Sequence, residues 1–60
     1  MNIAQQVKTF GNGDVNLTLV EADRLGDANQ DWENESTEFD FEDGSVMIIC
    51  GNCISIYASR

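Results

Sequence analysis

The two cysteines of the chain, Cys50 and Cys53, are separated by only Gly51 and Asn52. This spacing occurs in half-sites for zinc and in thiol–disulfide redox motifs. A structural zinc ion takes four nitrogen or sulfur ligands, and the chain has no histidine, so two copies would have to share the ion. Redox motifs place the first cysteine at a helix N-terminus, whereas strand-forming residues flank this pair. We therefore interpret the cysteines as small apolar residues beside a tight turn, and keep a structural homodimer with shared zinc as an alternative.

Oxygen-bearing side chains with the spacing of a calcium loop occur between residues 27 and 38. The first, third, fifth and twelfth positions of a calcium-binding helix–loop–helix loop correspond to Asp27, Asn29, Asp31 and Glu38. The sixth position of such a loop needs glycine for a sharp turn, but Trp32 occupies it here. Strand-forming residues also follow where the motif requires a helix. The match is incomplete, so a calcium-binding loop module is an alternative function with weak candidate ligands.

Catalytic chemistry has little support in this composition. Activation of a serine or cysteine nucleophile needs a positioned base, and the chain has no histidine. Carboxylates are abundant, but separating their pKa values needs a concave pocket shielded from water, which 60 residues can hardly enclose. We therefore expect no catalytic residues, no cofactor and no enzymatic activity.

The last third of the chain predicts the elements that would position these groups. Two β-branched, apolar runs lie on either side of Gly51-Asn52, which indicates a β-hairpin. The run 38–42 alternates acidic and aromatic residues and joins the hairpin through Asp43-Gly44, a dipeptide that favours a two-residue turn. Residues 38–58 therefore predict a three-stranded antiparallel meander.

Counting from these two turns assigns the side chains to two faces, because successive residues of a strand alternate sides. One face would collect Phe39, Phe41, Val46, Ile48, Cys50, Cys53, Ser55 and Tyr57. The other would collect Met47, Ile49, Ile54, Ile56 and Ala58, beside Glu38, Asp40 and Glu42. Both sides of the middle strand are apolar. We therefore expect the second face to be covered by the N-terminal part of the chain, by a second copy or by a target.

The first third of the chain has two competing interpretations. Residues 2–21 predict a second hairpin around the Gly-Asn-Gly sequence at 11–13, because apolar and polar residues alternate from Val15 to Leu19. The competing interpretation is a short helix over 3–10 that ends at the first of these glycines. We favour the hairpin.

The acidic segment between the two proposed hairpins predicts little regular structure. One helical turn fits residues 21–26, and residues 26–37 are expected to form a loop long enough to be functional. The chain therefore predicts one small domain over residues 1–60, of mainly β class. Its core would be an antiparallel sheet of four or five strands. A short helix near the N-terminus or at 21–26 is an optional addition to this sheet.

The charge of the chain is strongly one-sided, with 11 acidic and three basic residues and a formal net charge of −8. A field of this sign repels nucleic-acid phosphates and anionic membranes, so we expect direct binding to neither. Its natural partner is a basic protein surface, such as nucleic-acid-binding proteins carry. The charge also suits solubility or adaptation to salt, which is the alternative interpretation. The sequence has no signal-peptide pattern and no apolar run long enough for a membrane span, so we expect a cytoplasmic protein.

The acidic residues concentrate between positions 27 and 43. On a strand, alternate side chains project to one side about 6.6–6.8 Å apart, so Glu38, Asp40 and Glu42 would form a row of charges. This repeat is about twice the 3.4 Å axial spacing of phosphates along one DNA strand. The predicted partner-binding array comprises Asp27, Asp31, Glu33, Glu35, Glu38, Asp40, Glu42 and Asp43. The alternative is a solvated face that protects a sheet edge from pairing with other chains.

In length, negative charge and expected β content, the chain resembles the small acidic inhibitors encoded by phages, including nucleic-acid-mimicking anti-CRISPR and anti-restriction proteins. The resemblance includes no motif and transfers no functional residue. It implies a protein that occupies a nucleic-acid site on a host defence complex or on another host nucleic-acid enzyme, in the cytoplasm of the host cell. Because the domain is small and its central strand is apolar on both sides, a homodimer is a further expectation.

Overall fold

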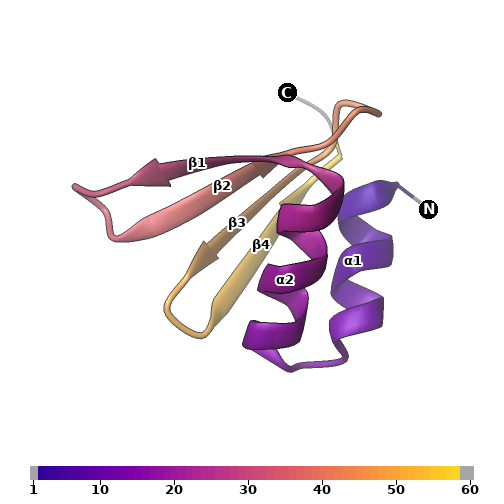
Figure 1. Cartoon of the computed structure of the whole chain (residues 1–60), viewed down its shortest axis with the longest axis horizontal. Coiled ribbons are helices and arrows are strands. Elements are labelled where there is room, and N and C mark those ends of the chain that lie inside the picture. The colour runs from indigo at the N-terminus through magenta and orange to yellow at the C-terminus, as the bar shows by residue number, and fades with distance from the viewer. Residues whose placement is uncertain (1, 59–60) are drawn as a thin grey trace.

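The computed structural model describes residues 2–58 and contains two helices followed by a four-stranded sheet (Figure 1). The helices are α1 (Ile3–Gly11) and α2 (Val15–Leu25), and the strands are β1 (Asp27–Asp31), β2 (Ser36–Asp40), β3 (Val46–Cys50) and β4 (Cys53–Tyr57). The strands are antiparallel and lie in the order β1-β2-β3-β4, so each strand pairs with its neighbour in sequence. Both helices pack on the same face of the sheet (Figure 1).

The expected small antiparallel sheet is confirmed, but the mainly β class is too narrow. The two helices contain about as many residues as the four strands, so the fold is a small α/β domain. The predicted β3–β4 hairpin is present with Cys50 opposite Cys53. Its turn begins at Gly51, whose φ of 60° is the positive value that the first residue of such a turn requires.

The predicted N-terminal hairpin is wrong, because residues 3–25 form the two helices. Each helix begins at a side chain that caps it. Asn2 Oδ1 accepts a hydrogen bond from the N–H of Gln5 (2.8 Å), and Asp14 Oδ1 accepts one from the N–H of Leu17 (3.1 Å). The Gly-Asn-Gly sequence does form a turn, but it connects helices, and Asn12 adopts the left-handed conformation that ends α1. The competing helix over 3–10 is therefore correct and extends one residue further.

The predicted loop over 26–37 is also wrong. Residues 27–31 form β1, which pairs along its whole length with β2. The sequence of β1, Asp-Ala-Asn-Gln-Asp, contains no β-branched or aromatic residue. Its strand conformation therefore comes from its pairing with β2. The helical turn proposed for 21–26 is the last part of α2, which ends at Leu25.

The core lies between the helices and the middle of the sheet. Ala4 and Val7 of α1 and Ala22 of α2 pack with Phe39 of β2 and Met47 of β3, and all five are buried. Ile49 and Phe41 complete this cluster, and Ile54 and Ile56 of β4 pack against it. The N-terminal part of the chain was expected to cover the sheet face that carries Met47, Ile49, Ile54 and Ile56. This expectation is confirmed, although the covering elements are helices.

Gly11 of α1 lies directly against Thr18 of α2, and both residues are buried. The Thr18 hydroxyl donates to the Asp14 carbonyl (2.8 Å), which satisfies it inside the helix pair. A Cβ atom at residue 11 would lie 1.7 Å from Thr18 Oγ1 and 3.1 Å from Thr18 Cα. Glycine at this position therefore sets the distance between the helices.

Gly11→Ala is expected to destabilise the domain by about 1–3 kcal/mol, because the new methyl group overpacks the helix interface. In an open helix the same change would stabilise by about 1 kcal/mol, so the sign distinguishes the two environments. Urea unfolding measures the difference. The double variant Gly11→Ala/Thr18→Ala should recover part of the loss, and a stabilised single variant would contradict the close packing.

The β2–β3 connection differs from the expected two-residue turn. Gly44 has a φ of 88°, and its N–H donates to the Phe41 carbonyl (3.0 Å). These features define a three-residue loop over 42–44 that ends with a glycine in the left-handed conformation. The additional loop residue shifts the pairing of β2 with β3 by one, so Phe39 lies opposite Met47.

This shift corrects the assignment of side chains to faces, because a slip of one residue moves every side chain of a strand to the other side. Phe39 was expected beside Ile48, but it shares the helix-covered face with Met47. Glu38 and Asp40 were expected beside Met47, but they lie on the opposite face, where Glu38 pairs with Ile48. The acidic side chains of β2 are therefore directed away from the helices.

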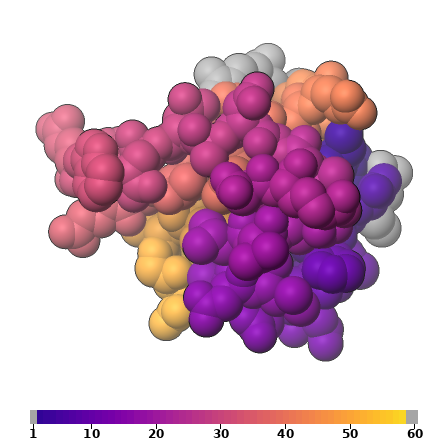
Figure 2. Space-filling model, viewed as in Figure 1, coloured from indigo at the N-terminus to yellow at the C-terminus, as the bar shows by residue number. Residues whose placement is uncertain are grey.

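The loop between β2 and β3 also holds the start of α1 (Figure 2). The Asp43 carboxylate accepts hydrogen bonds from the N–H of Ile3 (2.8 Å) and from the N–H of Ser45 (2.9 Å). The buried Ser45 hydroxyl donates to the same carboxylate and accepts the N–H of Ala4 (3.2 Å). These bonds satisfy two backbone donors that a helix N-terminus leaves without an internal partner, and the carboxylate faces the positive end of the helix dipole.

Stability should depend on pH through Asp43. The hydrogen bond from the Ser45 hydroxyl, followed by that from the Ile3 N–H, lowers the pKa of Asp43 below its ordinary value. A pKa that is lower in the folded state contributes stability above the ordinary aspartate pKa, and this contribution is lost as pH falls through the lowered value. Asp43→Asn should therefore lower the melting temperature at neutral pH, with a difference from the parent chain that shrinks in acid. A difference that is constant with pH would contradict this role.

Candidate acidic binding surface

The sheet face opposite the helices is not covered by any helix or strand of the part of the chain that the structure describes; we call it the open face. Cross-strand pairing determines which residues it carries. They are Asp27, Asn29 and Asp31 of β1, Ser36, Glu38 and Asp40 of β2, Val46, Ile48 and Cys50 of β3, and Cys53, Ser55 and Tyr57 of β4. The open face is therefore acidic along β1 and β2 and mostly apolar along β3 and β4.

The acidic half of the open face consists of two adjacent rows. Along β1, Asp27, Asn29 and Asp31 follow one another at about 6.8 Å, and Glu38 and Asp40 have the same spacing along β2. The register places Asp27 directly opposite Asp40. Like charges at opposite positions destabilise a sheet. Asn29 offsets part of this cost, because its Nδ2 donates to Asp40 Oδ2 (3.2 Å).

The β1–β2 hairpin projects beyond the helices and ends in an exposed turn (Figures 1 and 2). The Asp31 carboxylate accepts hydrogen bonds from Asn34 Nδ2 (2.8 Å) and from the Asn34 N–H (3.2 Å), and these bonds lower the pKa of Asp31. Glu35 closes the turn with a φ of 52°, a conformation that non-glycine residues seldom adopt. These bonds stabilise the turn, and Glu33 and Glu35 are exposed at its end.

Trp32 lies at the end of this hairpin and is 82% exposed. Sequence reasoning noted this residue only as a departure from the calcium motif. Tryptophan is among the residues that most often anchor protein interfaces. A large apolar side chain surrounded by acids was the signal that could have identified it as a functional residue.

The eight acidic residues predicted to bind a partner lie in four places. Asp27, Asp31, Glu38 and Asp40 share the open face, and Glu33 and Glu35 occupy the β1–β2 turn. Glu42 lies in the β2–β3 loop, so the expected row of Glu38, Asp40 and Glu42 is reduced to its first two members. Asp43 is engaged at the start of α1 and has a structural role in this fold. The unforeseen strand β1 supplies the second row.

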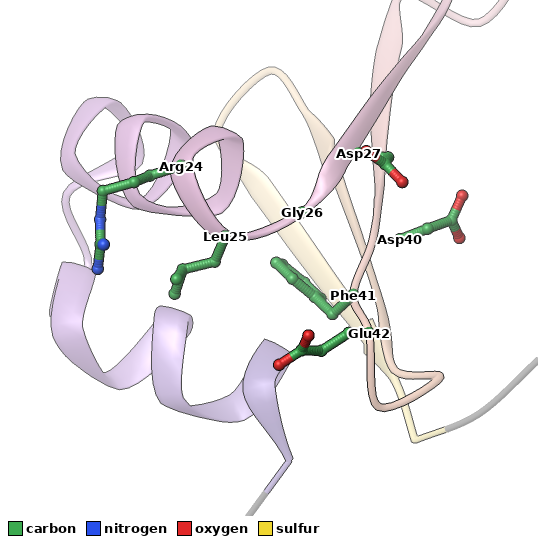
Figure 3. A pocket seen from close by; sticks show the side chains of 7 residues that line it. All are labelled: Arg24, Leu25, Gly26, Asp27, Asp40, Phe41 and Glu42. Carbon is green, nitrogen blue, oxygen red and sulfur yellow. The ribbon is translucent and has the colours of Figure 1, made fainter.

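A shallow hollow of about 320 Å³ lies where α2 meets the sheet (Figure 3). Leu25 and Phe41 provide apolar surface, and the Glu42 carboxylate lies beside them, whereas the Asp27 and Asp40 side chains point away towards the open face (Figure 3). The Arg24 side chain turns away from these carboxylates and pairs with Glu21 of its own helix (2.9 Å) (Figure 3). Apolar surface beside negative charge suits the methylene stem and charged head of a lysine or arginine side chain.

The candidate metal ligands do not come together. Asp27, Asn29 and Asp31 are spread along an extended strand, where their side chains are too far apart to surround one calcium ion, and Glu38 lies beside only Asn29. Within residues 2–58, no group of three or more histidine, cysteine, aspartate or glutamate side chains is arranged to hold a metal ion. The geometry therefore does not support the calcium loop. Cys50 and Cys53 are free thiols at the end of the β3–β4 hairpin.

Comparison with protein-family models, with curated proteins and with solved structures finds no match to this chain. Neither helix of the described residues has the length and apolar character needed to cross a membrane. Function must therefore be inferred from the open face and the β1–β2 hairpin.

Asp27→Asn is expected to stabilise the domain by up to about 0.5 kcal/mol at low salt, because it removes a charge that faces Asp40 across the strand pair. Added salt should reduce the gain, since salt screens repulsion between exposed charges. Asp23→Asn on α2 removes the same charge from a helix surface and is the matched control. Equal effects of the two changes in urea unfolding would show that the cross-strand pair carries no specific repulsion.

Proposed function

We propose that this chain is an acidic protein-binding inhibitor. Its open face and projecting β1–β2 hairpin occupy a basic nucleic-acid-binding surface of a host defence complex or of another nucleic-acid-processing complex. The observation that carries the proposal is the double row of carboxylates on a sheet face whose described residues include no basic side chain. The basic residues among the described ones, Lys8 and Arg24, lie on the helices.

The charge arrangement supports mimicry of a phosphate backbone. Glu38 and Asp40 of β2 are about 6.8 Å apart, about twice the 3.4 Å axial spacing of phosphates in one DNA strand. Asp27 and Asp31 of β1, with Asn29 between them, are about 13.6 Å apart, about four times that spacing. Asp27 and Asp40 lie opposite each other and repel each other. A surface that served only solubility could avoid this repulsion by spacing its charges more widely. A basic partner would relieve this repulsion, so the arrangement favours a cationic surface as the ligand.

The shape of the chain supports binding to a groove. The β1–β2 hairpin projects from the body of the domain (Figure 2). Its turn presents the exposed Trp32, which lies between Asp31 and Glu33 in the sequence. In this arrangement Trp32 adds apolar contact area to the charged surface. The hydrogen bonds within the turn reduce the entropy that the hairpin loses on binding. The hollow beside Phe41 accepts a basic side chain of the partner at the other end of the acidic rows.

The proposal is tested by capturing binding proteins from a host-cell lysate on immobilised chain and eluting them with a salt gradient. Retained proteins should bind nucleic acid, and added DNA or RNA should release them. The double variant Asp27→Asn/Glu38→Gln should lower affinity at least tenfold and weaken its salt dependence, because it removes charges from the open face. The matched control, Glu21→Gln/Asp23→Asn on α2, has the same net charge but leaves both rows and the hollow intact, and it should bind nearly as the parent does.

A second variant separates the contribution of shape from that of charge. Trp32→Ala should lower affinity for the captured protein while leaving the salt dependence unchanged, because it removes contact area but no charge. Equal losses in the two charge variants would show that net charge alone drives binding. Capture that nucleic acid does not disturb would overturn mimicry and direct attention to the apolar half of the open face.

A further inference from the structure

The exposure of Cys50 and Cys53 does not fit their interpretation as small apolar residues beside a turn. Free cysteine is among the most frequently buried residue types. Here both thiols are exposed, and these are the only cysteines of the chain. Packing therefore does not explain the pair, and the chemistry of the thiols has to be considered.

The β3–β4 turn places the two thiols side by side. Cys50 and Cys53 are directly opposite each other across the turn that Gly51 begins, so their side chains project from the same face of the sheet. Opposite residues of an antiparallel pair have Cα atoms about 4.5–5.5 Å apart. Two sulfur atoms on a rigid hairpin at this separation can ligate one ion without rearrangement of the backbone.

The surroundings of the pair favour a cation. The Cys50 thiol contacts the Asn34 carbonyl (3.8 Å), which places it beside the acidic β1–β2 turn. Neither Lys8 nor Arg24 lies on this face of the sheet, and the chain carries a net charge of −8. Such a field concentrates cations and repels anionic disulfides that would otherwise exchange with the thiols.

The ligand set selects the kind of ion. Zinc in a structural site takes four ligands, and no described histidine, cysteine, aspartate or glutamate completes such a set around the two thiols. Soft thiolate ligands favour Cu(I), zinc and iron–sulfur clusters. Of these, Cu(I) is stable with two thiolates, whereas zinc and the clusters take four protein ligands. We propose that Cys50 and Cys53 form a two-thiolate site for a soft monovalent ion of the Cu(I) type. Binding replaces two S–H protons, which are released to solvent, and no electron is transferred.

The site is tested with the full chain, reduced and free of oxygen, by titrating Cu(I) against a chromophoric Cu(I) chelator. We expect one ion per chain. Cys50→Ser and Cys53→Ser should each weaken binding at least tenfold, because each removes one of two ligands from an exposed position where the fold does not depend on it. Circular dichroism checks that each variant is folded. Glu33→Gln removes a charge from the same turn but retains both thiols and the Asp31–Asn34 bonds, so it is the control for non-specific attraction, and its affinity should change by less than threefold.

Four results would overturn the site. The first two are no uptake of Cu(I) and uptake that neither serine variant reduces. The third is half an ion per chain, which would indicate an ion bridged between two copies. The fourth is a loss in Glu33→Gln as large as in the serine variants. Alkylation followed by mass spectrometry under the same reducing conditions adds a further check. A Cys50–Cys53 disulfide that persists there would show that the pair is an oxidised crosslink instead. The test does not depend on the proposed inhibitor function.

Discussion

The hydrogen bonds that join Asp43 and Ser45 to the first turn of α1 determine much of the rest of the structure. They connect residues about forty positions apart and hold the helix layer on the sheet. They also require the Asp43 carboxylate to point towards α1, which a loop ending at Gly44 in the left-handed conformation allows. The resulting three-residue loop fixes the register of β2 against β3. A polar contact between segments distant in the sequence thus decides which face of the sheet carries the charges.

The register of β2 against β3 allows the apolar residues to be buried while the carboxylates stay in contact with solvent. The apolar residues of β2 and β3 that point towards the helices, Phe39 and Met47, are almost completely buried. The carboxylates Glu38 and Asp40 remain on the opposite side, where they keep contact with solvent and avoid the desolvation cost of a buried charge. The opposite register would direct these acids at the helices. A highly acidic segment and a compact core can therefore share the same strand.

Sequence reasoning succeeded where a short turn determined the structure and failed where distant contacts did. Gly51-Asn52 between two apolar runs was sufficient to predict the β3–β4 hairpin and its register. The alternation from Val15 to Leu19 was misleading, because Asp14 caps a helix there and the apolar residues at 15 and 22 lie on its buried side. β1 gave no signal of its own, because only its pairing with β2 makes it a strand.

For the candidate site, too, the residue types were predictable from the sequence and their arrangement was not. The acidic residues could be listed from the sequence, and four of them do share one face. Their arrangement could not be predicted, because it depends on a strand without strand-forming residues and on a loop one residue longer than expected. Asp43 could not be distinguished from its acidic neighbours, because its partner, Ile3, is distant in sequence. Trp32 was visible in the sequence, but its exposure depends on how far the β1–β2 hairpin projects.

The order of the two layers along the chain has a consequence for folding during synthesis. α1 and α2 emerge from the ribosome first, but the strand that supplies Met47 to cover Ala4 and Val7 is made only after residue 45. Isolated helices of this length are marginal in water. The early part of the nascent chain therefore stays unfolded, or depends on chaperones, until β3 has emerged. Synthesis that stops before β3 would release an acidic chain with no core.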